Sequence, residues 1–169
     1  AFTLQLFAVL EDGTLAQANT IAEQNNAGTA DITANYVVKA VDANGDVLAT
    51  QPTGTLTVNV GGGNATQGSD YISGPTVTAT IGTEFTIDSK DDALADSGET
   101  FNLSLEDGSW SEDSTYEEVT YQGNVTTTIT DATDPSTPPE EADSAFTLQL
   151  FAVLEDGTLA QANTIAEQN

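Results

Sequence analysis

Residues Thr55 to Val60 read TLTVNV, a run in which polar and apolar side chains alternate. Successive side chains of a strand point to opposite sides, so the three apolar residues share one face and the three polar residues share the other. This pattern is typical of a half-buried strand, with one face in a core and the other in solvent.

Similar runs, rich in Thr, Val, Ile, Tyr and Phe, recur on both sides of this stretch. The predicted strands are Ile32–Val41, Gly54–Val60, Thr76–Ile81, Glu84–Ile87, Thr100–Leu105, Glu117–Tyr121 and Asn124–Ile129. Turn-forming residues separate them, among them Asn44-Gly45, Gly61–Gly63 and Asp107-Gly108. About seven or eight short strands at this spacing predict an all-β fold, an antiparallel β-sandwich of the immunoglobulin-like kind. The stretch Leu15–Gln24 lacks a clean helical stripe, so we expect a loop or a short strand there.

The two outermost segments of the chain are identical. Ala1–Asn25 reads AFTLQLFAVLEDGTLAQANTIAEQN, and the same residues return unchanged at Ala145–Asn169. An unbroken match of this length indicates a tandem repeat with a period of 144 residues, the offset between the two copies. A repeated building unit favours a fibre or a stalk over an enzyme.

The repeat divides the chain into three predicted parts. A β-sandwich unit covers residues 1–130, an acidic linker covers 131–144, and the opening segment of the next repeat covers 145–169. The linker, DATDPSTPPEEADS, holds three of the five prolines of the chain. Proline keeps such a linker stiff and extended, so we expect sandwich modules that are held apart.

The chain is strongly acidic. It has 27 Asp and Glu residues against two basic residues, Lys39 and Lys90, and its formal net charge is −25. Nucleic acids and anionic membranes bind through clustered Lys and Arg, so neither is an expected partner. The charge fits either a solubilising surface or the binding of cations. Because the chain has no His and no Cys, zinc, copper and disulfides are excluded, and hard cations such as calcium remain.

The same composition argues against catalysis and against membrane insertion. The most apolar stretch, Phe2–Leu10, is far shorter than the ~20 residues of a membrane span. The chain lacks the His and Cys of common nucleophile pairs, and it carries no Gly-x-Ser-x-Gly or phosphate-binding motif, so we expect no enzyme. The aromatic residues Trp110, Tyr116 and Tyr121 fit either a sugar-stacking patch or packing at strand ends.

Several phrases carry a resemblance to a known family. They are ATQGSDY (65–71), IDSKDDALADSGETF (87–101), NLSLE (102–106) and VTTTITD (125–131). Upstream, IAEQNNAGTADITANYVV (21–38) resembles the first strand of the same family. By the order and spacing of these phrases, residues 21–131 resemble a Calx-beta domain, a sandwich module of sodium-calcium exchangers and of bacterial surface proteins.

The resemblance implies a calcium site at one end of the sandwich. By position, its ligands are Glu23, Asp70, Asp91, Asp92, Asp96 and Asp131. Calcium takes about six to eight oxygen ligands, and converging carboxylates repel one another without a cation. The sequence departs from the family in two ways. The closing run of aspartates is reduced to Asp131, and Ser89-Lys90 precedes the aspartate pair, where the Lys90 ammonium is able to neutralise part of the cluster.

The roles of these carboxylates stay open at the level of sequence. Asp70 follows Gly-Ser, so it either caps its own turn or binds the cation. Asp91, Asp92 and Asp96 form either a ligand set or a solvated acidic loop.

The predicted function is that of a structural repeat in a bacterial surface adhesin, similar to an extender repeat. It would serve cell adhesion or biofilm formation outside the cell, as a calcium-stiffened spacer or fibre body with neighbouring identical repeats as its partners. The alternative is a self-assembling filament that associates end to end or laterally by donor-strand exchange through residues 145–169. The alternation of Phe146, Leu148 and Leu150 suits a strand that is buried in such a partner.

Overall fold

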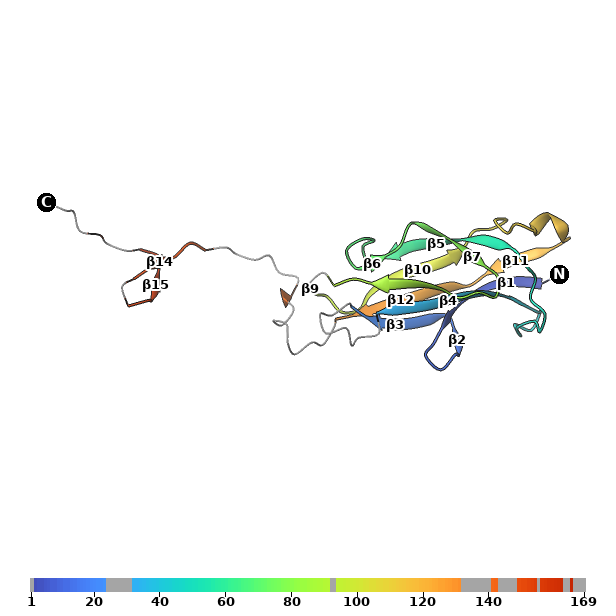
Figure 1. The fold of residues 1–169 in the computed structure, drawn as a ribbon, viewed down its shortest axis with the longest axis horizontal. Coiled ribbons are helices and arrows are strands. Elements are labelled where there is room, and N and C mark those ends of the chain that lie inside the picture. The colour runs from blue at the N-terminus through green and yellow to red at the C-terminus, as the bar shows by residue number, and fades with distance from the viewer. Residues whose placement is uncertain are drawn as a thin grey trace.

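Two β-sheets lie face to face in the computed structural model, which describes residues 2–23, 32–91, 94–131, 141–142, 149–154, 156–162 and 165 (Figure 1). The first sheet has the order β11-β1-β4-β8-β6, with β2 paired to β1. Its strands are β1 (Phe2–Val9), β2 (Leu15–Ala16), β4 (Thr33–Val41), β6 (Tyr71–Ile72), β8 (Phe85–Ser89) and β11 (Val119–Gln122). The second sheet has the order β3-β12-β10-β5-β7. Its strands are β3 (Ala18–Ala22), β5 (Thr55–Gly63), β7 (Thr76–Thr80), β10 (Glu99–Leu105) and β12 (Asn124–Thr130).

The predicted all-β sandwich is therefore confirmed. A short 3-10 turn, η1 (Asp113–Thr115), precedes β11. Over the ranges given above, no helix has the length and apolar character needed to cross a membrane.

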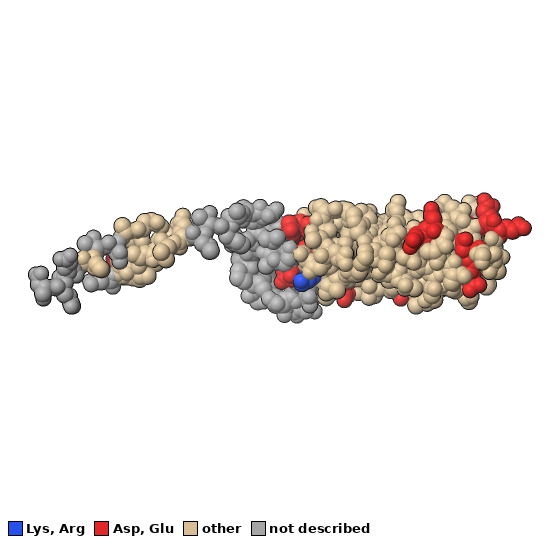
Figure 2. Space-filling model, turned by 90° about the horizontal axis from the view of Figure 1, so that it is seen from above, with Lys and Arg blue, Asp and Glu red and all other residues tan. Residues whose placement is uncertain are grey.

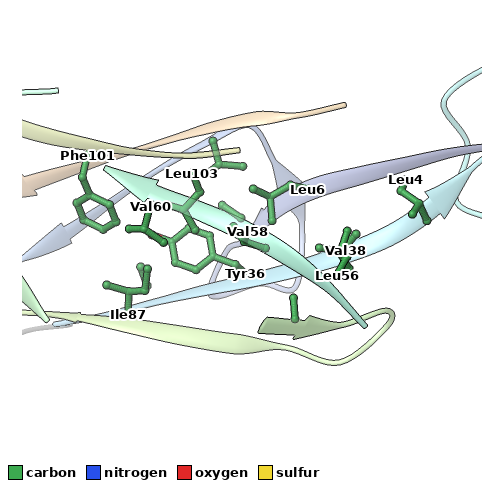
Figure 3. Packing of buried hydrophobic residues seen from close by; sticks show 14 of the residues in the cluster. Leu4, Leu6, Tyr36, Val38, Leu56, Val58, Val60, Ile87, Phe101 and Leu103 are labelled. Atoms are coloured by element: carbon green, nitrogen blue, oxygen red, sulfur yellow. The ribbon is translucent and has the colours of Figure 1, made fainter. Parts of the chain in front are cut away.

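The interior is built from alternate residues of both sheets, as TLTVNV predicts. Leu56, Val58 and Val60 of β5 are buried, while Thr55 and Asn59 are exposed. Figure 3 shows the apolar side chains of β5 beside those of β1, β4, β8 and β10 in the space between the sheets. Each fully buried side chain of this size contributes about 1.5 to 3 kcal/mol to stability, so this shared core holds the two sheets together.

A polar bridge that includes Tyr36 crosses the core. The Tyr36 and Thr127 hydroxyl oxygens lie 2.5 Å apart, and Thr127 donates to Asn19 Oδ1 at 2.7 Å. Because Thr127 has a single hydroxyl proton, Tyr36 must be the donor in their hydrogen bond. The bridge joins β4 of the first sheet to β12 and β3 of the second. Burial raises the pKa of Tyr36 well above its ordinary value.

The backbone passes from one sheet to the other near the start and near the end of the sandwich. Strands β11 and β12 are separated only by Gly123, yet β11 pairs with β1 in the first sheet and β12 with β10 in the second. Gly123 has a φ of 96°, and a Cβ there would lie 2.6 Å from the Leu6 carbonyl oxygen. Only glycine combines this conformation with so close an approach. The opening segment crosses similarly, with β1 in the first sheet and β3 in the second.

Two edge pairs are parallel, in contrast to the antiparallel pairing that the sequence predicts. In β1 and β11, Phe2 lies opposite Val119, and in β3 and β12, Ala22 lies opposite Thr130. The first and last strands therefore run in the same direction, and the chain enters the sandwich at one end and leaves it at the other (Figure 1). We call the end with Phe2 and Val119 the N-terminal pole and the end with Ala22 and Thr130 the C-terminal pole.

The seven predicted runs correspond to β4, β5, β7, β8, β10, β11 and β12. Among these seven, the largest difference is in β5, which continues through Gly61–Gly63, where the sequence predicts a turn. A register shift in the pairing of β5 with β10 marks a bulge there. A Cβ on Gly63 would lie 2.1 Å from the Thr100 carbonyl oxygen, so the glycine lets the two backbones pass. Leu15–Gln24, predicted as loop or short strand, contains the short strands β2 and β3.

Two further small strand pairs include residues that follow β12. Strand β13 (Glu141–Ala142) pairs in parallel with β9 (Leu94–Ala95). In the second copy of the repeated segment, β14 (Ala152–Val153) pairs with β15 (Leu159–Ala160). The predicted limits of the three parts, 1–130, 131–144 and 145–169, stay predictions.

Candidate metal centre

The C-terminal pole brings together positions that are far apart in the sequence. Glu23 follows β3, Asp70 precedes β6, Lys90 follows β8 and Asp131 follows β12. Backbone hydrogen bonds connect these segments: Glu23 donates its N–H to the Thr130 carbonyl at 2.9 Å, and Lys90 donates to the Asp70 carbonyl at 2.8 Å. The sandwich topology thus places the predicted site segments at one end.

Asp70 has a structural role in its own turn. It is 3% exposed, and its carboxylate accepts a hydrogen bond from the Thr66 N–H. Its own N–H donates to the Thr66 carbonyl at 3.0 Å. The Lys90 ammonium donates to the Gly68 carbonyl of the same turn at 2.7 Å. Of the two roles left open for Asp70, the turn-capping role is present, and a ligand role would add to it.

Two further carboxylates are partly or wholly withdrawn from solvent at this pole. Glu23 is 2% exposed at the end of β3. Asp131 donates its N–H to Ser97 Oγ at 3.2 Å, while its buried Oδ1 accepts no hydrogen bond from the described residues. A buried carboxylate oxygen without a donor is costly, and a hard cation is a natural partner for it. The chemistry of these donors fits calcium.

The three predicted ligands between β8 and β10 are not all buried at the pole. Asp91 is exposed, Asp96 is half-buried, and Asp92 lies outside the described residues. Within the described ranges, no group of three or more acidic side chains is arranged to hold a metal ion. The predicted ligands among the described residues therefore share a pole without a closed coordination shell in those ranges, and the ligand set stays a prediction.

Ser89 is a residue of this pole whose role the sequence reasoning missed. It is fully buried, its Oγ donates to the Ala22 carbonyl at 2.5 Å, and its N–H donates to the Ile32 carbonyl at 2.8 Å. The first bond ties the end of β8 to the end of β3, directly beside Glu23, and the second ties it to the residue before β4. The available signal was the alternation in β8, which places Ser89 on the inward face with Ile87.

Acidic side chains gather at both ends of the sandwich (Figure 2). Near the N-terminal pole, Asp42 Oδ1 accepts the N–H groups of Asn44 at 2.8 Å and Asp46 at 3.0 Å. These bonds hold the pKa of Asp42 below its ordinary value. Asp113 Oδ1 accepts a hydrogen bond from the Tyr121 hydroxyl group at 2.6 Å. The pKa of Tyr121 is raised to about 12, first by burial and second by this hydrogen bond to a carboxylate. The two poles therefore carry charge of the same sign.

The aromatic residues at the N-terminal pole act in packing. Trp110 is buried, and its ring makes a T-shaped contact with the Phe2 ring at a centroid distance of 5.7 Å and stacks on Tyr116 at 5.1 Å. Its Nε1 donates to the Thr53 carbonyl at 3.1 Å. Of the two roles considered for these aromatics, packing at strand ends is the one in place, and it anchors the start of β1.

Comparison with known proteins gives a distant structural similarity. No family model matches the sequence, and no curated protein matches it. The structure is similar to the crystal structure of the apo form of the Calx CBD1 domain, at 17% identity and a TM-score of 0.45, over 79% of this chain and 100% of that chain. It is also similar to the crystal structure of CBD12 from CALX1.2, at 17% identity and a TM-score of 0.42, over 75% of this chain and 45% of that chain.

Proposed function

We propose that this chain is a structural repeat of an extracellular adhesin or fibre on a bacterial surface, where it acts as a spacer. The observation that carries the proposal is that the chain enters the sandwich at the N-terminal pole, at Phe2, and leaves it at the C-terminal pole, at Thr130. In a tandem array, each module then lengthens the fibre by its own long dimension and does not fold back on its neighbour. The proline-rich segment 131–144 keeps successive modules apart, and no catalytic step belongs to this role.

Calcium is the cation that we propose to stiffen the array. Asp131 is the first residue after β12 and the first residue of the linker, so a cation held there joins a module to the chain that follows it. The buried Oδ1 of Asp131 and the buried carboxyl group of Glu23 support this position. Extracellular modules bind calcium with dissociation constants of about 0.1 to 1 mM, so the site fills only outside the cell.

The test is thermal unfolding of the chain in chelator, in 5 mM calcium and in 5 mM magnesium. At a dissociation constant of about 0.5 mM, calcium adds about 1.4 kcal/mol to the free energy of unfolding. For a sandwich of this size, that raises the unfolding midpoint by about 5 °C. Magnesium screens charge to a similar degree but prefers a smaller octahedral shell, so we expect a smaller rise.

The variant Asp91→Asn/Asp92→Asn locates the effect. We expect it to lose the calcium-specific rise, because two of the predicted ligands lose their charge. The control is Asp107→Asn, which removes a carboxylate near the N-terminal pole and should keep the full rise. Identical unfolding curves in calcium and magnesium would contradict a calcium site and would mean that the acidic residues serve only solubility.

A further inference from the structure

Three neighbouring strands of the second sheet, β5, β10 and β12, present an outer face without charge (Figure 1). The residues that alternate with the buried ones in these strands are Thr55, Thr57, Asn59, Gly61, Thr100, Asn102, Ser104, Asn124, Thr126, Thr128 and Thr130. The chain as a whole has 27 Asp and Glu residues and a net charge of −25. Charge repulsion, which keeps acidic molecules apart, is therefore weakest over this face.

This sheet also holds every Asn-x-Ser/Thr motif of the sequence. The motifs are Asn64-Ala65-Thr66, Asn102-Leu103-Ser104 and Asn124-Val125-Thr126. Such a motif is the acceptor of N-linked glycosylation in secreted proteins, but one motif alone is common by chance. Here the three lie in one sheet, because the first follows β5 directly and the other two lie in β10 and β12.

The motifs of β10 and β12 face each other across the ladder. Asn102 lies opposite Thr126, and Ser104 lies opposite Asn124. Side chains two residues apart share a face of a strand, so both asparagines and both hydroxyl residues project from the outer face. Thr126 Oγ1 donates to Asn102 Oδ1 at 2.7 Å, so the hydroxyl of one motif holds the amide oxygen of the other.

Asn64 is joined to the same patch through Thr100. Its Oδ1 accepts the Thr100 N–H at 2.8 Å and the Thr100 hydroxyl at 3.2 Å. A backbone N–H only donates, so the Asn64 oxygen must be its partner, and Nδ2 is left for other contacts. Among the described residues, neither Asn64 Nδ2 nor Asn102 Nδ2 donates a hydrogen bond.

The strand beside Asn102 leaves room for a substituent on its amide nitrogen. Asn102 lies opposite Gly61, and Gly62 follows. A Cβ built on Gly62 would have Asn102 Nδ2, at 3.5 Å, as its only neighbour within 4 Å. Asn102 itself is half-buried, whereas Asn64 and Asn124 are exposed. A group on any of the three nitrogens can therefore extend into solvent.

We propose that Asn64, Asn102 and Asn124 are N-glycosylated, so that sugars cover the uncharged outer face of the second sheet. In this reaction, the asparagine Nδ2 attacks C1 of a sugar that is activated as a diphosphate ester. A C1–N bond forms and the C1–O bond breaks. The diphosphate leaves with the electron pair, and a base of the transferase takes one amide proton. The proposal rests on the extracellular location proposed above, but not on calcium or on the spacer role.

The test is mass spectrometry of the protein isolated from the surface of the cells that produce it. Cleavage at acidic residues separates the three motifs, because Asp or Glu residues lie between them. We expect each of the three peptides to exceed its sequence mass by whole sugar residues. A peptide N-glycosidase should release the sugars and leave aspartate in place of each modified asparagine.

Variants produced in the same cells show whether the motif directs the modification. Thr66→Ala, Ser104→Ala and Thr126→Ala keep every asparagine but remove the hydroxyl group that the motif requires. Each should remove the sugar from its own asparagine alone. The matched control is Thr128→Ala, which lies on the same face outside any motif and should keep all three sugars.

Each outcome decides the proposal. Sugars on the three asparagines that disappear with the motif hydroxyl groups support it. A motif without sugar overturns its own assignment, and surface protein without sugar at any motif overturns the proposal while the proposed function stands. Sugars that persist in the three variants also overturn it, because the motifs would not direct them. Absence of the protein from the cell surface would overturn both.

Discussion

Asp131 is the predicted ligand whose carboxyl group allows the most direct test of the metal site. Its Oδ1 is buried and accepts no hydrogen bond from the part of the chain that the structure describes. Without a cation, such a group weakens the fold, and with a cation it becomes an anchor. The same residue is therefore expected to have opposite effects in chelator and in calcium.

The first prediction concerns Asp131→Asn. In chelator, the substitution replaces a half-buried carboxylate whose Oδ1 accepts no hydrogen bond from the described residues, so we expect the free energy of unfolding to rise by about 1 kcal/mol. In calcium, the variant should lose most of the rise in unfolding midpoint that the unmodified chain shows. Thermal unfolding in both solutions measures the two effects, with Asp107→Asn as the control. A variant that is less stable in chelator would indicate that this carboxylate already has a partner.

The second prediction concerns the Tyr36 hydroxyl group, which donates to Thr127 in the core. Tyr36→Phe removes one buried hydrogen bond, so we expect a loss of about 1 kcal/mol at neutral pH. Urea unfolding measures this loss. Tyr116→Phe removes a hydroxyl from a side chain that is 45% exposed, and it should cost much less. Equal losses would mean that the bridge between the sheets contributes nothing.

The third prediction is a loss of stability at alkaline pH. Burial raises the pKa of Tyr36, Tyr71 and Tyr121 in the folded chain. Above about pH 10, the unfolded chain releases these phenol protons while the folded chain keeps them, so stability falls as the pH rises. Below that pH the contribution is fully present. Urea midpoints between pH 8 and 11 should fall less steeply for Tyr36→Phe, and parallel slopes would contradict this origin.

At the scale of the strands, the positions of most strands and their buried faces could be predicted from the sequence. The alternation in TLTVNV predicted the buried face of β5, because alternation depends only on neighbours along the chain. The parallel pairs were not predicted, since they depend on which distant strand lies at each edge. The glycine in YQGNV resembles an ordinary turn glycine, and only the position of Leu6 beside it reveals a crossing between sheets.

The candidate site was predictable to a similar extent. The family resemblance pointed to segments that the structure places at one pole, which is a consequence of strand order. The turn formed by Asp70 was left open, because a local hydrogen bond and a distant cation compete for the same carboxylate. The role of Ser89 was missed, since its partner, the Ala22 carbonyl, lies on a distant strand.

The fourth prediction concerns the crossing at Gly123. Gly123→Ala adds a Cβ at a positive φ and within 2.6 Å of the Leu6 carbonyl oxygen. We expect a loss of about 3 kcal/mol or more, measured by urea unfolding. The matched control is Gly108→Ala, which has a φ of 71° and open space around it, and it should lose about 1 kcal/mol. Equal losses would show that the backbone at the crossing relaxes freely.

At the scale of the whole molecule, the fifth prediction concerns length. A chain of two complete repeats should reach a maximum dimension of about 120 Å, because two sandwiches of about 40 Å are joined by an extended linker. Small-angle X-ray scattering measures it. Both poles are acidic, so raising the salt concentration should shorten the chain slightly by screening their repulsion. A maximum dimension near half the expected value would mean that the modules fold back on one another.

The direction of the edge strands also decides how the molecule bears force. When the two chain ends are pulled apart, β1 is drawn against β11 and β3 against β12, along the strands. The hydrogen bonds of each pair then share the load in shear and must break together, whereas strands pulled at adjacent ends peel apart one bond at a time. Resistance to pulling depends on the rate of unfolding and not on equilibrium stability. The sandwich is thus arranged to stay folded under tension.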